Sequence, residues 1–183
     1  MNIFYLDSDP KVCASMHNDK HCVKMILEYA QLLSTAHRVL DGNPVKSKTK
    51  TGRNVVRYSL NESDLESTLY HATHINHPSA VWVRQSYKNY VWLYRLLVDL
   101  CKEYTFRYGK IHKVESSQLL EKLYLPPNKI ARTSFTEPTP AMPDDVKIIG
   151  DSIASYRNYY INNKQHLAKW KNRSVPNWFV EKN

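Results

Sequence analysis

Glycine is scarce in this chain, with 4 among 183 residues. So few glycines argue against a glycine-rich phosphate loop, a Rossmann turn and an all-β fold built on many tight turns. Cysteine is also scarce: Cys13, Cys22 and Cys101 are odd in number and form no C-x-x-C pair, which argues against a disulfide framework and favours a reducing compartment. No apolar run reaches 18 residues, and the first residues do not resemble a signal peptide, so we expect a cytoplasmic protein without a membrane span.

Acidic residues are outnumbered by basic ones. The chain has 26 Lys and Arg against 17 Asp and Glu, which gives a formal net charge of +9 and a pI near 9.4. This balance favours a polyanionic partner, either nucleic acid or a phosphorylated nucleotide, over a membrane surface. The 13 tyrosines offer flat stacking surfaces with a hydroxyl, as a nucleotide or interface site requires.

The pattern of apolar residues and capping signals predicts a mainly α fold, a compact single domain (1–183) of about five to six helices. Residues 3–6 are apolar and predict either a short strand or an extended strap on the core. Pro10 and Pro78 each suit the first position of a helix, and Gly109 suits a helix end. The predicted helices cover about 10–16, a long segment ending near 40, 62–72, a segment opening at Pro78, 87–108, 115–124 and 152–170.

Three segments fall outside these helices. Residues 45–57 are basic with little apolar content and predict a mobile basic loop, either solvated or a phosphate clamp. Residues 125–148 form a long Pro-rich loop, which is either functional or a solvated connector. The C-terminal tail interleaves basic and aromatic residues, from Lys169 to Phe179, a pattern that suits phosphate contact with base stacking or simple docking of the terminus.

The long helix that ends near residue 40 has a polar seam on an otherwise apolar cylinder. At about 100° per residue, its polar side chains fall within a sector roughly 80° wide: His17, His21, Lys24, Glu28, Gln31 and Thr35. A buried seam of this kind is costly unless its members pair with each other, with a neighbouring element or with a ligand. It predicts either a functional site or an internal ion-pair ladder built on Lys24 and Glu28.

Other candidate residues lie on or beside the remaining helices. Asn89, Glu103 and Arg107 share one face of the helix at 87–108, and we expect this line to meet the seam. The predicted phosphate-binding or nucleotide-binding residues are His17, Lys20, His77, Arg84, Asn89, Arg107, Lys110, His112, Tyr156 and Arg157. His71, His74 and His77 recur every three residues, but no carboxylate or cysteine stands at ligand spacing, so capping is favoured over a metal site. We expect neither a metal nor a cofactor.

Several blocks resemble a family of small, uncharacterised proteins from tailed bacteriophages. They include Asp19-Lys20-His21 with Lys24 and Glu28, Asn76-His77-Pro78, Arg107-Tyr108-Gly109-Lys110 and the block from Ala154 to Tyr160. The similarity spans nearly the whole chain and implies a location in the cytoplasm of the infected bacterial host cell. It implies no particular activity.

Size, basic charge, a His-containing first helix and a central helix ending in Arg-Tyr-Gly are also similar to the phage pyrimidine-dimer DNA glycosylases. Those enzymes attack through the α-amine of a processed N-terminal Thr, with a Glu on the first helix. Here Met1 precedes Asn2, we expect the methionine to stay, and no Glu occupies the corresponding part of the helix. The resemblance therefore implies an all-helical repair enzyme whose chemistry is rebuilt on the seam.

Two functions follow as hypotheses. The first is an enzyme acting on DNA or a nucleotide, such as a glycosylase or lyase, with Lys24 as a desolvated nucleophile, Glu28 or Asp19 as acid or base, and His21 or His77 as proton shuttle. The second is an anti-defence protein that sequesters or cleaves a host nucleotide signal, such as a cyclic oligonucleotide or an ADP-ribose derivative. An open basic groove would favour the first, and an enclosed pocket lined by cations and aromatic rings the second. A third hypothesis is a structural or host-interaction protein, in which the seam only holds the interior together.

Overall fold

The computed structural model describes residues 1–180. These residues form nine α-helices, two short 3-10 helices and one two-stranded antiparallel sheet. The predicted mainly α class is confirmed, but there are more helices than the five or six expected, and several are shorter than predicted. Within the described part of the chain, no helix is long and apolar enough to cross a membrane.

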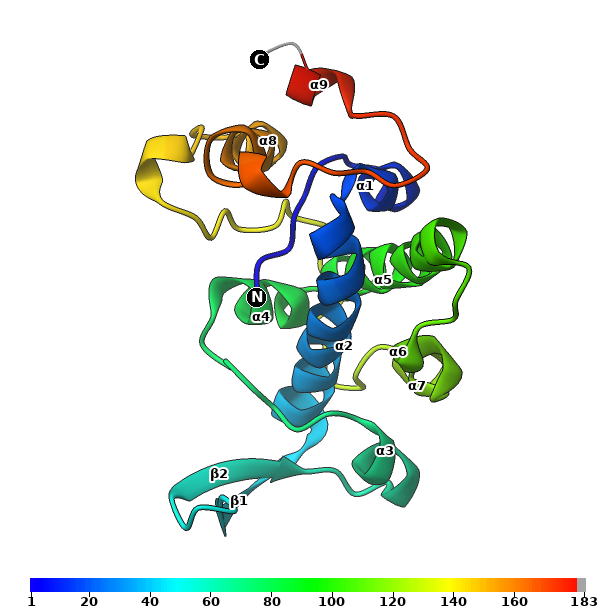
Figure 1. The fold of residues 1–183 in the computed structure, drawn as a ribbon. Coiled ribbons are helices and arrows are strands. Elements are labelled where there is room, and N and C mark those ends of the chain that lie inside the picture. The colour runs from blue at the N-terminus through cyan, green and yellow to red at the C-terminus, as the bar shows by residue number, and fades with distance from the viewer. Residues whose placement is uncertain (181–183) are drawn as a thin grey trace.

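Two long helices form the centre of the fold (Figure 1). Helix α2 (Asp19–Asp41) starts behind the capping side chain of Asn18, so the chain begins a new helix there after α1 (Pro10–Met16). Helix α5 (Tyr87–Tyr108) ends at Gly109, which takes a left-handed conformation that favours glycine. Helix α4 (Pro78–Gln85) packs against both.

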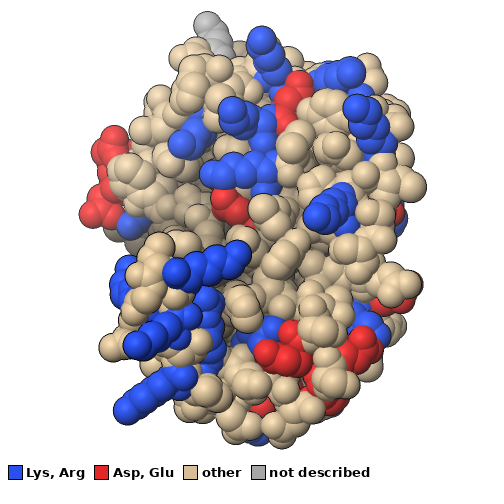
Figure 2. Space-filling model, turned by 60° about the horizontal axis from the view of Figure 1, so that its bottom comes forward, with Lys and Arg blue, Asp and Glu red and all other residues tan. Residues whose placement is uncertain are grey.

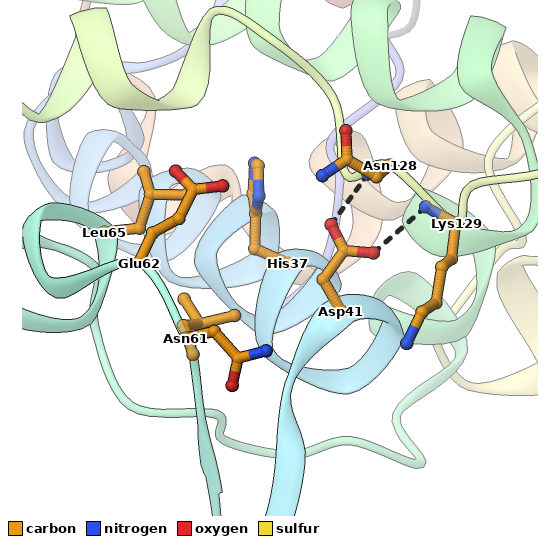
Figure 3. A pocket seen from close by; sticks show the side chains of 8 residues that line it. His37, Asp41, Asn61, Glu62, Leu65, Asn128 and Lys129 are labelled. Carbon is orange, nitrogen blue, oxygen red and sulfur yellow. Dashed lines mark hydrogen bonds between the residues drawn. The ribbon is translucent and has the colours of Figure 1, made fainter.

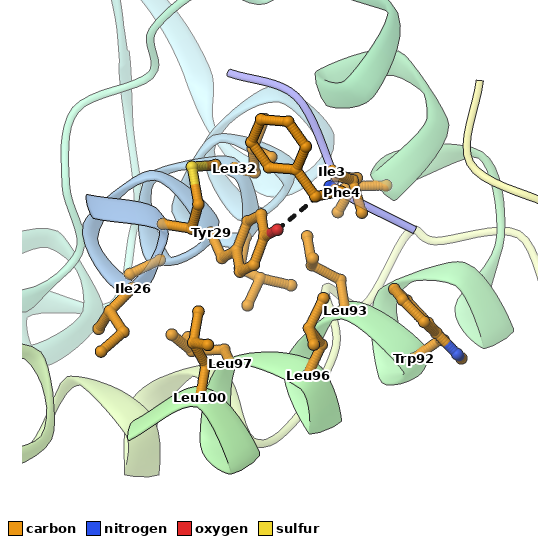
Figure 4. Close-up of a cluster of buried hydrophobic side chains, with 14 of the residues drawn as sticks. Ile3, Phe4, Ile26, Tyr29, Leu32, Trp92, Leu93, Leu96, Leu97 and Leu100 are labelled. Atoms are coloured by element: carbon orange, nitrogen blue, oxygen red, sulfur yellow. Dashed lines mark hydrogen bonds between the residues drawn. The ribbon is translucent and has the colours of Figure 1, made fainter. Parts of the chain in front are cut away.

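Residues 3–6 form a buried extended strap, not a strand. The strap crosses α2, and the backbone N–H of Phe4 donates a hydrogen bond of 3.2 Å to the hydroxyl of Tyr29. Figure 4 shows these two residues in an apolar cluster that also includes side chains of α5, among them Leu93 and Leu97. The strap places the start of the chain against the middle of α2.

Residues 45–57 belong to a hairpin and not to the loop predicted there. Strand β1 (Asn43–Lys48) pairs with β2 (Asn54–Ser59) in a hairpin, with Lys46 opposite Val56. Val45 and Ser47 alternate with Lys46 and Lys48 in β1, and β2 contains Val55 and Val56, which is compatible with strands although the segment contributes little to the core. Helix α3 (Ser63–Thr68) follows and is shorter than the 62–72 expected.

Two helices predicted in the second half of the chain are interrupted or end early. The helix expected at 115–124 is two short helices, α6 (Lys113–Ser116) and α7 (Leu119–Leu123), because Gln118 between them has a positive φ of 62°. The Pro-rich segment is irregular as far as the 3-10 helix at Asp144–Val146.

The helix expected at 152–170 ends early. Helix α8 (Ser152–Asn163) is followed by a 3-10 turn at Gln165–Leu167, and the chain then returns past α1 to α9 (Asn177–Val180). Trp170 Nε1 donates to the carbonyl of Met16, and Trp178 Nε1 to Met16 Sδ. These two tryptophans of the tail thus dock the C-terminal segment on the body.

Candidate functional site

The predicted polar seam is buried at both ends and exposed between them, and its first residue, His17, lies before α2, at the C-terminal cap of α1. His17 and Thr35 are fully buried, and His21 is nearly so. The side chain of Lys24, in contrast, is 62% exposed, so the prediction of a desolvated lysine is wrong. Lys24, like Lys20 one turn earlier, lies on the solvent side of the helix.

The two seam histidines belong to the core. His17 bonds through Nδ1 to the carbonyl of Cys13 and through Nε2 to the hydroxyl of Tyr29, at 2.8 and 2.9 Å. His21 stacks on Phe4 and bonds through Nδ1 to the hydroxyl of Tyr160 at 2.6 Å. Burial lowers the pKa of His17 to about 4, and burial with nearby positive charge lowers that of His21 to about 3. Both rings are therefore neutral at pH 7, and His21 is held too firmly to act as a mobile proton shuttle.

Glu28 lies between two amines at the surface of α2. Its Oε1 is 3.1 Å from Lys24 Nζ, and its Oε2 is 3.6 Å from the amino nitrogen of Met1. The carboxylate is only 14% exposed. The strap at residues 3–6 positions Met1 here, so a glutamate does stand beside this amine although the linear sequence did not lead us to expect it.

His77 completes this group. Burial lowers the pKa of His77, the positive charges of Met1 and His74 lower it further, and Glu28 acts in the opposite direction. His77 is also the N-cap of α4, where its Nδ1 accepts from the N–H of Ser79, and Pro78 is the first residue of that helix as predicted. We call the Met1 amine, Lys24, Glu28 and His77 the Glu28 cluster.

Further cations extend from the Glu28 cluster in two directions. Toward α8, the positive charges of Lys164 and Lys24 both lower the pKa of His21. Toward the hairpin, Arg84 of α4 interacts electrostatically with Tyr58 of β2, and the positive charge of Arg57 lowers the pKa of His71. We call this surface, from Lys164 across α2 and α4 to the hairpin, the cationic face. Figure 2 shows a hollow on the left of the molecule, with blue Lys and Arg atoms gathered above and below it and red Asp and Glu atoms at its left edge and beside the upper blue group.

Arg84 holds the loop that precedes α4. Its Nη1 donates a 2.6 Å hydrogen bond to the carbonyl of Ile75, and partial burial lowers the pKa of its guanidinium. His74 in the same loop has a positive φ of 47° and bonds to Thr73 Oγ1. The predicted phosphate ligand Arg84 therefore lies on the cationic face but has one donor already engaged.

Part of the polar line of α5, Glu103 and Arg107, lies at the start of α2, where Arg107 contacts the backbone of His17 and the side chain of Asp19. Arg107 Nη1 is 3.0 Å from Asp19 Oδ1 and donates to the carbonyl of His17, and Arg107 Nε pairs with Glu103 at 2.7 Å. Arg173 in the C-terminal segment forms a second, two-pronged pair with Glu103. Arg107 and Glu103 are buried at the centre of this network, which joins three parts of the chain. Asp19 forms its ion pair with Arg107 in this network, and not with Lys24.

Other predicted ligands lie away from the Glu28 cluster. Asn89 is buried and bonds to Trp82 and Thr136, and Tyr156 is buried with its hydroxyl donating to the carbonyl of Thr139. Arg157 bonds to the carbonyl of Leu6 and lies 3.5 Å from Asp7. Lys110 and His112 follow the C-terminal end of α5, opposite the side where the chain begins (Figure 1), and His112 caps α6.

A cavity of about 220 Å³ lies at the far end of α2, between α3 and the Pro-rich segment. Its lining includes Asp41, Glu62, Lys129 and His37, whose pKa burial lowers to about 4. Asp41 accepts hydrogen bonds from the backbone N–H groups of Asn128 and Lys129, as Figure 3 shows. Two carboxylates on its wall make this cavity a poor receptor for phosphate.

The three cysteines are free and buried. In the part of the chain that the structure describes, no three His, Cys, Asp or Glu side chains lie close enough to hold a metal ion. Comparison of the chain with family models, with curated proteins and with solved structures gives no match. The chemistry of the site must therefore be inferred from its geometry.

Proposed function

We propose that this protein binds nucleic acid along the cationic face and acts on a nucleotide at the Glu28 cluster, as a DNA glycosylase or lyase. The observation that carries the proposal is the carboxylate of Glu28 between two amines, at 3.1 and 3.6 Å, in a surface otherwise rich in cations. An amine beside a carboxylate is the pair that imine chemistry at a sugar carbon needs.

The amine is the nucleophile. It must lose a proton before it attacks, and Glu28 is placed to accept that proton from Lys24 or from the amino group of Met1. At an abasic sugar, the free amine adds to the C1′ aldehyde, and loss of water with a proton from Glu28 gives an imine. At an intact nucleotide, the amine bonds to C1′ as the C1′–N bond breaks and the base leaves with its electron pair. The C1′–O4′ bond then breaks, O4′ takes a proton, and the nitrogen lone pair forms the imine.

Strand cleavage follows from the imine. Removal of a C2′ proton by a base breaks the C3′–O bond, and the 3′ phosphate leaves with that electron pair. Glu28 and His77 are the two groups of the cluster that can accept this proton. His77 suits the task because burial and the neighbouring positive charges lower its pKa and favour the neutral ring.

The form of the surface favours a polymer over a small nucleotide. Lys24 of the Glu28 cluster is exposed, and the cations around the cluster are spread from Lys164 to Arg57, as backbone phosphates require. The cavity around His37, in contrast, has carboxylates in its wall. The geometry thus gives less support to capture of a free nucleotide signal.

The test is covalent trapping on a duplex with one abasic site in the presence of sodium borohydride, which reduces an imine to a stable amine. We expect an adduct that peptide mapping assigns to Lys24 or to the amine of Met1. Glu28→Gln should reduce the trapping rate at least about 100-fold, in the range of lost acid-base catalysis. Parallel duplexes carrying damaged bases test removal of the base.

Lys102→Ala is a matched control for Lys24→Ala. Lys102 is a 69% exposed helical lysine paired with Asp99 at 2.9 Å, so it resembles Lys24 in exposure and pairing but lies on α5. Lys102→Ala should trap at the wild-type rate, whereas Lys24→Ala should abolish an adduct on Lys24 or slow one on Met1. No adduct, or an adduct only on another lysine, would overturn the proposal.

A further inference from the structure

The β1–β2 hairpin projects from the body at the lower left of Figure 1. It carries five cations, and residues 43–59 include no Asp or Glu; the cations are Lys46, Lys48, Lys50, Arg53 and Arg57. Most of β1 is exposed, and Val45 and Val56 are 47% and 58% exposed. The hairpin thus contributes little to the core, and its charge is of one sign.

Within residues 1–180, hydrogen bonds fix the hairpin to the body at its base. Arg38, which is fully buried in α2, donates from Nη1 to the carbonyl of Tyr58 at 2.8 Å and pairs with Glu66 of α3. Gly42 joins α2 to β1, and its N–H donates to the carbonyl of Arg38. An isolated two-stranded ribbon is marginally stable in water, so this firm anchor keeps an otherwise unsupported arm in one direction.

The strand register places cations and aliphatic groups on both faces of the ribbon. Lys46 lies opposite Val56 on one face, and Arg57 lies opposite Val45 on the other. A concave surface runs along the ribbon, with a volume of about 400 Å³ and a lining that includes Lys46, Asn54 and Val56. Such a surface can meet a phosphate backbone with its lysines and a sugar or thymine methyl with its valines.

We propose that the hairpin is an arm that enters the major groove of duplex DNA while the cationic face holds the adjacent backbone. The major groove admits a two-stranded β-ribbon, and the all-cationic charge of the arm complements the phosphates on both walls. In Figure 2 the lower group of blue atoms, on the side of the hairpin, borders the same hollow as the cations above it. The inference rests on the proposed function for its ligand, but not on the chemistry at Glu28.

The first test is the salt dependence of binding to an undamaged duplex, measured by fluorescence anisotropy. The variant Lys46→Gln/Lys48→Gln/Arg57→Gln removes three cations of the arm. The slope of log Kobs against log[NaCl] should become less steep by about 2.7, as loss of three phosphate contacts requires. The control variant changes three exposed lysines on helices of the body to Gln: Lys11, Lys102 and Lys113. It should keep the wild-type slope.

The second test is dimethyl sulfate footprinting, which reports guanine N7 in the major groove. Wild-type protein should protect N7 positions that the hairpin variant leaves reactive, with the same melting temperature for both proteins because the arm lies outside the core. The proposal that the hairpin enters the major groove would be overturned by an unchanged salt slope, by equal affinities for single-stranded and duplex DNA, or by the absence of N7 protection. A protein that shows these binding effects but no borohydride adduct would refute the lyase chemistry and leave the arm standing.

Discussion

Mild acid should destabilise this protein through its buried histidines. The rings of His17, His21 and His37 are buried, and their pKa values fall from 6.5 to about 4, 3 and 4, respectively, chiefly because burial disfavours the charged form. The unfolded chain therefore binds more protons than the folded chain below pH 6.5. Stability is complete above that value and decreases as the pH falls toward the folded pKa values.

The size of the effect follows from these shifts. A histidine with a pKa of 6.5 unfolded and about 4 folded loses about 2 kcal/mol of stabilisation between pH 7.5 and pH 5, and three such rings together lose up to about 6 kcal/mol. Typical domains have only about 5–15 kcal/mol in total. The half-buried His77 and His112, whose pKa values are also lowered, add in the same direction.

Urea unfolding at pH 7.5 and pH 5.0 is the assay, because few carboxylates change protonation in this interval. His17→Gln should unfold more easily at pH 7.5, through lost bonds to Cys13 and Tyr29, but should lose about 2 kcal/mol less than wild type on acidification. Ser34→Ala, which removes a buried hydrogen bond to Ala30 on α2, should keep the full loss. Equal wild-type unfolding midpoints at the two pH values would refute the reasoning.

Two further predictions concern single side chains. Glu103→Gln should cost about 3–5 kcal/mol in urea unfolding, because the fully buried Arg107 loses its buried carboxylate partner and keeps only the more exposed Asp19. Arg173→Gln, which removes the more exposed partner of Glu103, should cost no more than about 1 kcal/mol, and equal costs would contradict the assigned roles. Gly42→Ala should lower stability by about 1–3 kcal/mol, because its Cβ would collide with the carbonyl oxygen of Arg38 and crowd that of Ser59; a thermal melt unchanged from wild type would contradict this packing.

Local signals in the sequence were sufficient for several helix boundaries. Asp9 accepts hydrogen bonds at the N-terminus of α1, Pro10 and Pro78 occupy first helical positions, and Gly109 ends α5 with φ of 63°. Each boundary depends on one residue and its immediate neighbours, so a linear pattern is enough to predict it.

Features that depend on distant residues could not be predicted in this way. The hairpin is anchored by Arg38, which bonds to Tyr58 some 20 residues later. The helix expected at 115–124 is interrupted at Gln118 by a backbone conformation that a non-glycine residue rarely adopts.

In the candidate site, too, local spacing could be predicted and contacts between distant residues could not. Helical spacing correctly paired Lys24 with Glu28, but it gave no information on which side of α2 meets solvent. The place of the Met1 amine beside Glu28 depends on the path of the strap at residues 3–6 over the core. A hydrophobic start to the chain was the one signal that pointed to this path, and it does not specify a direction.

The central claim is that nucleic acid lies across the cationic face and over the Glu28 cluster. The most direct measurement is a ¹H–¹⁵N NMR titration of the protein with a short duplex that contains one stable abasic-site analogue. We predict chemical-shift changes at backbone amides around Lys24, Glu28 and His77 and along the hairpin, with little change at Lys110 beyond α5. Changes concentrated around the cavity at His37, or no change at all, would contradict the claim.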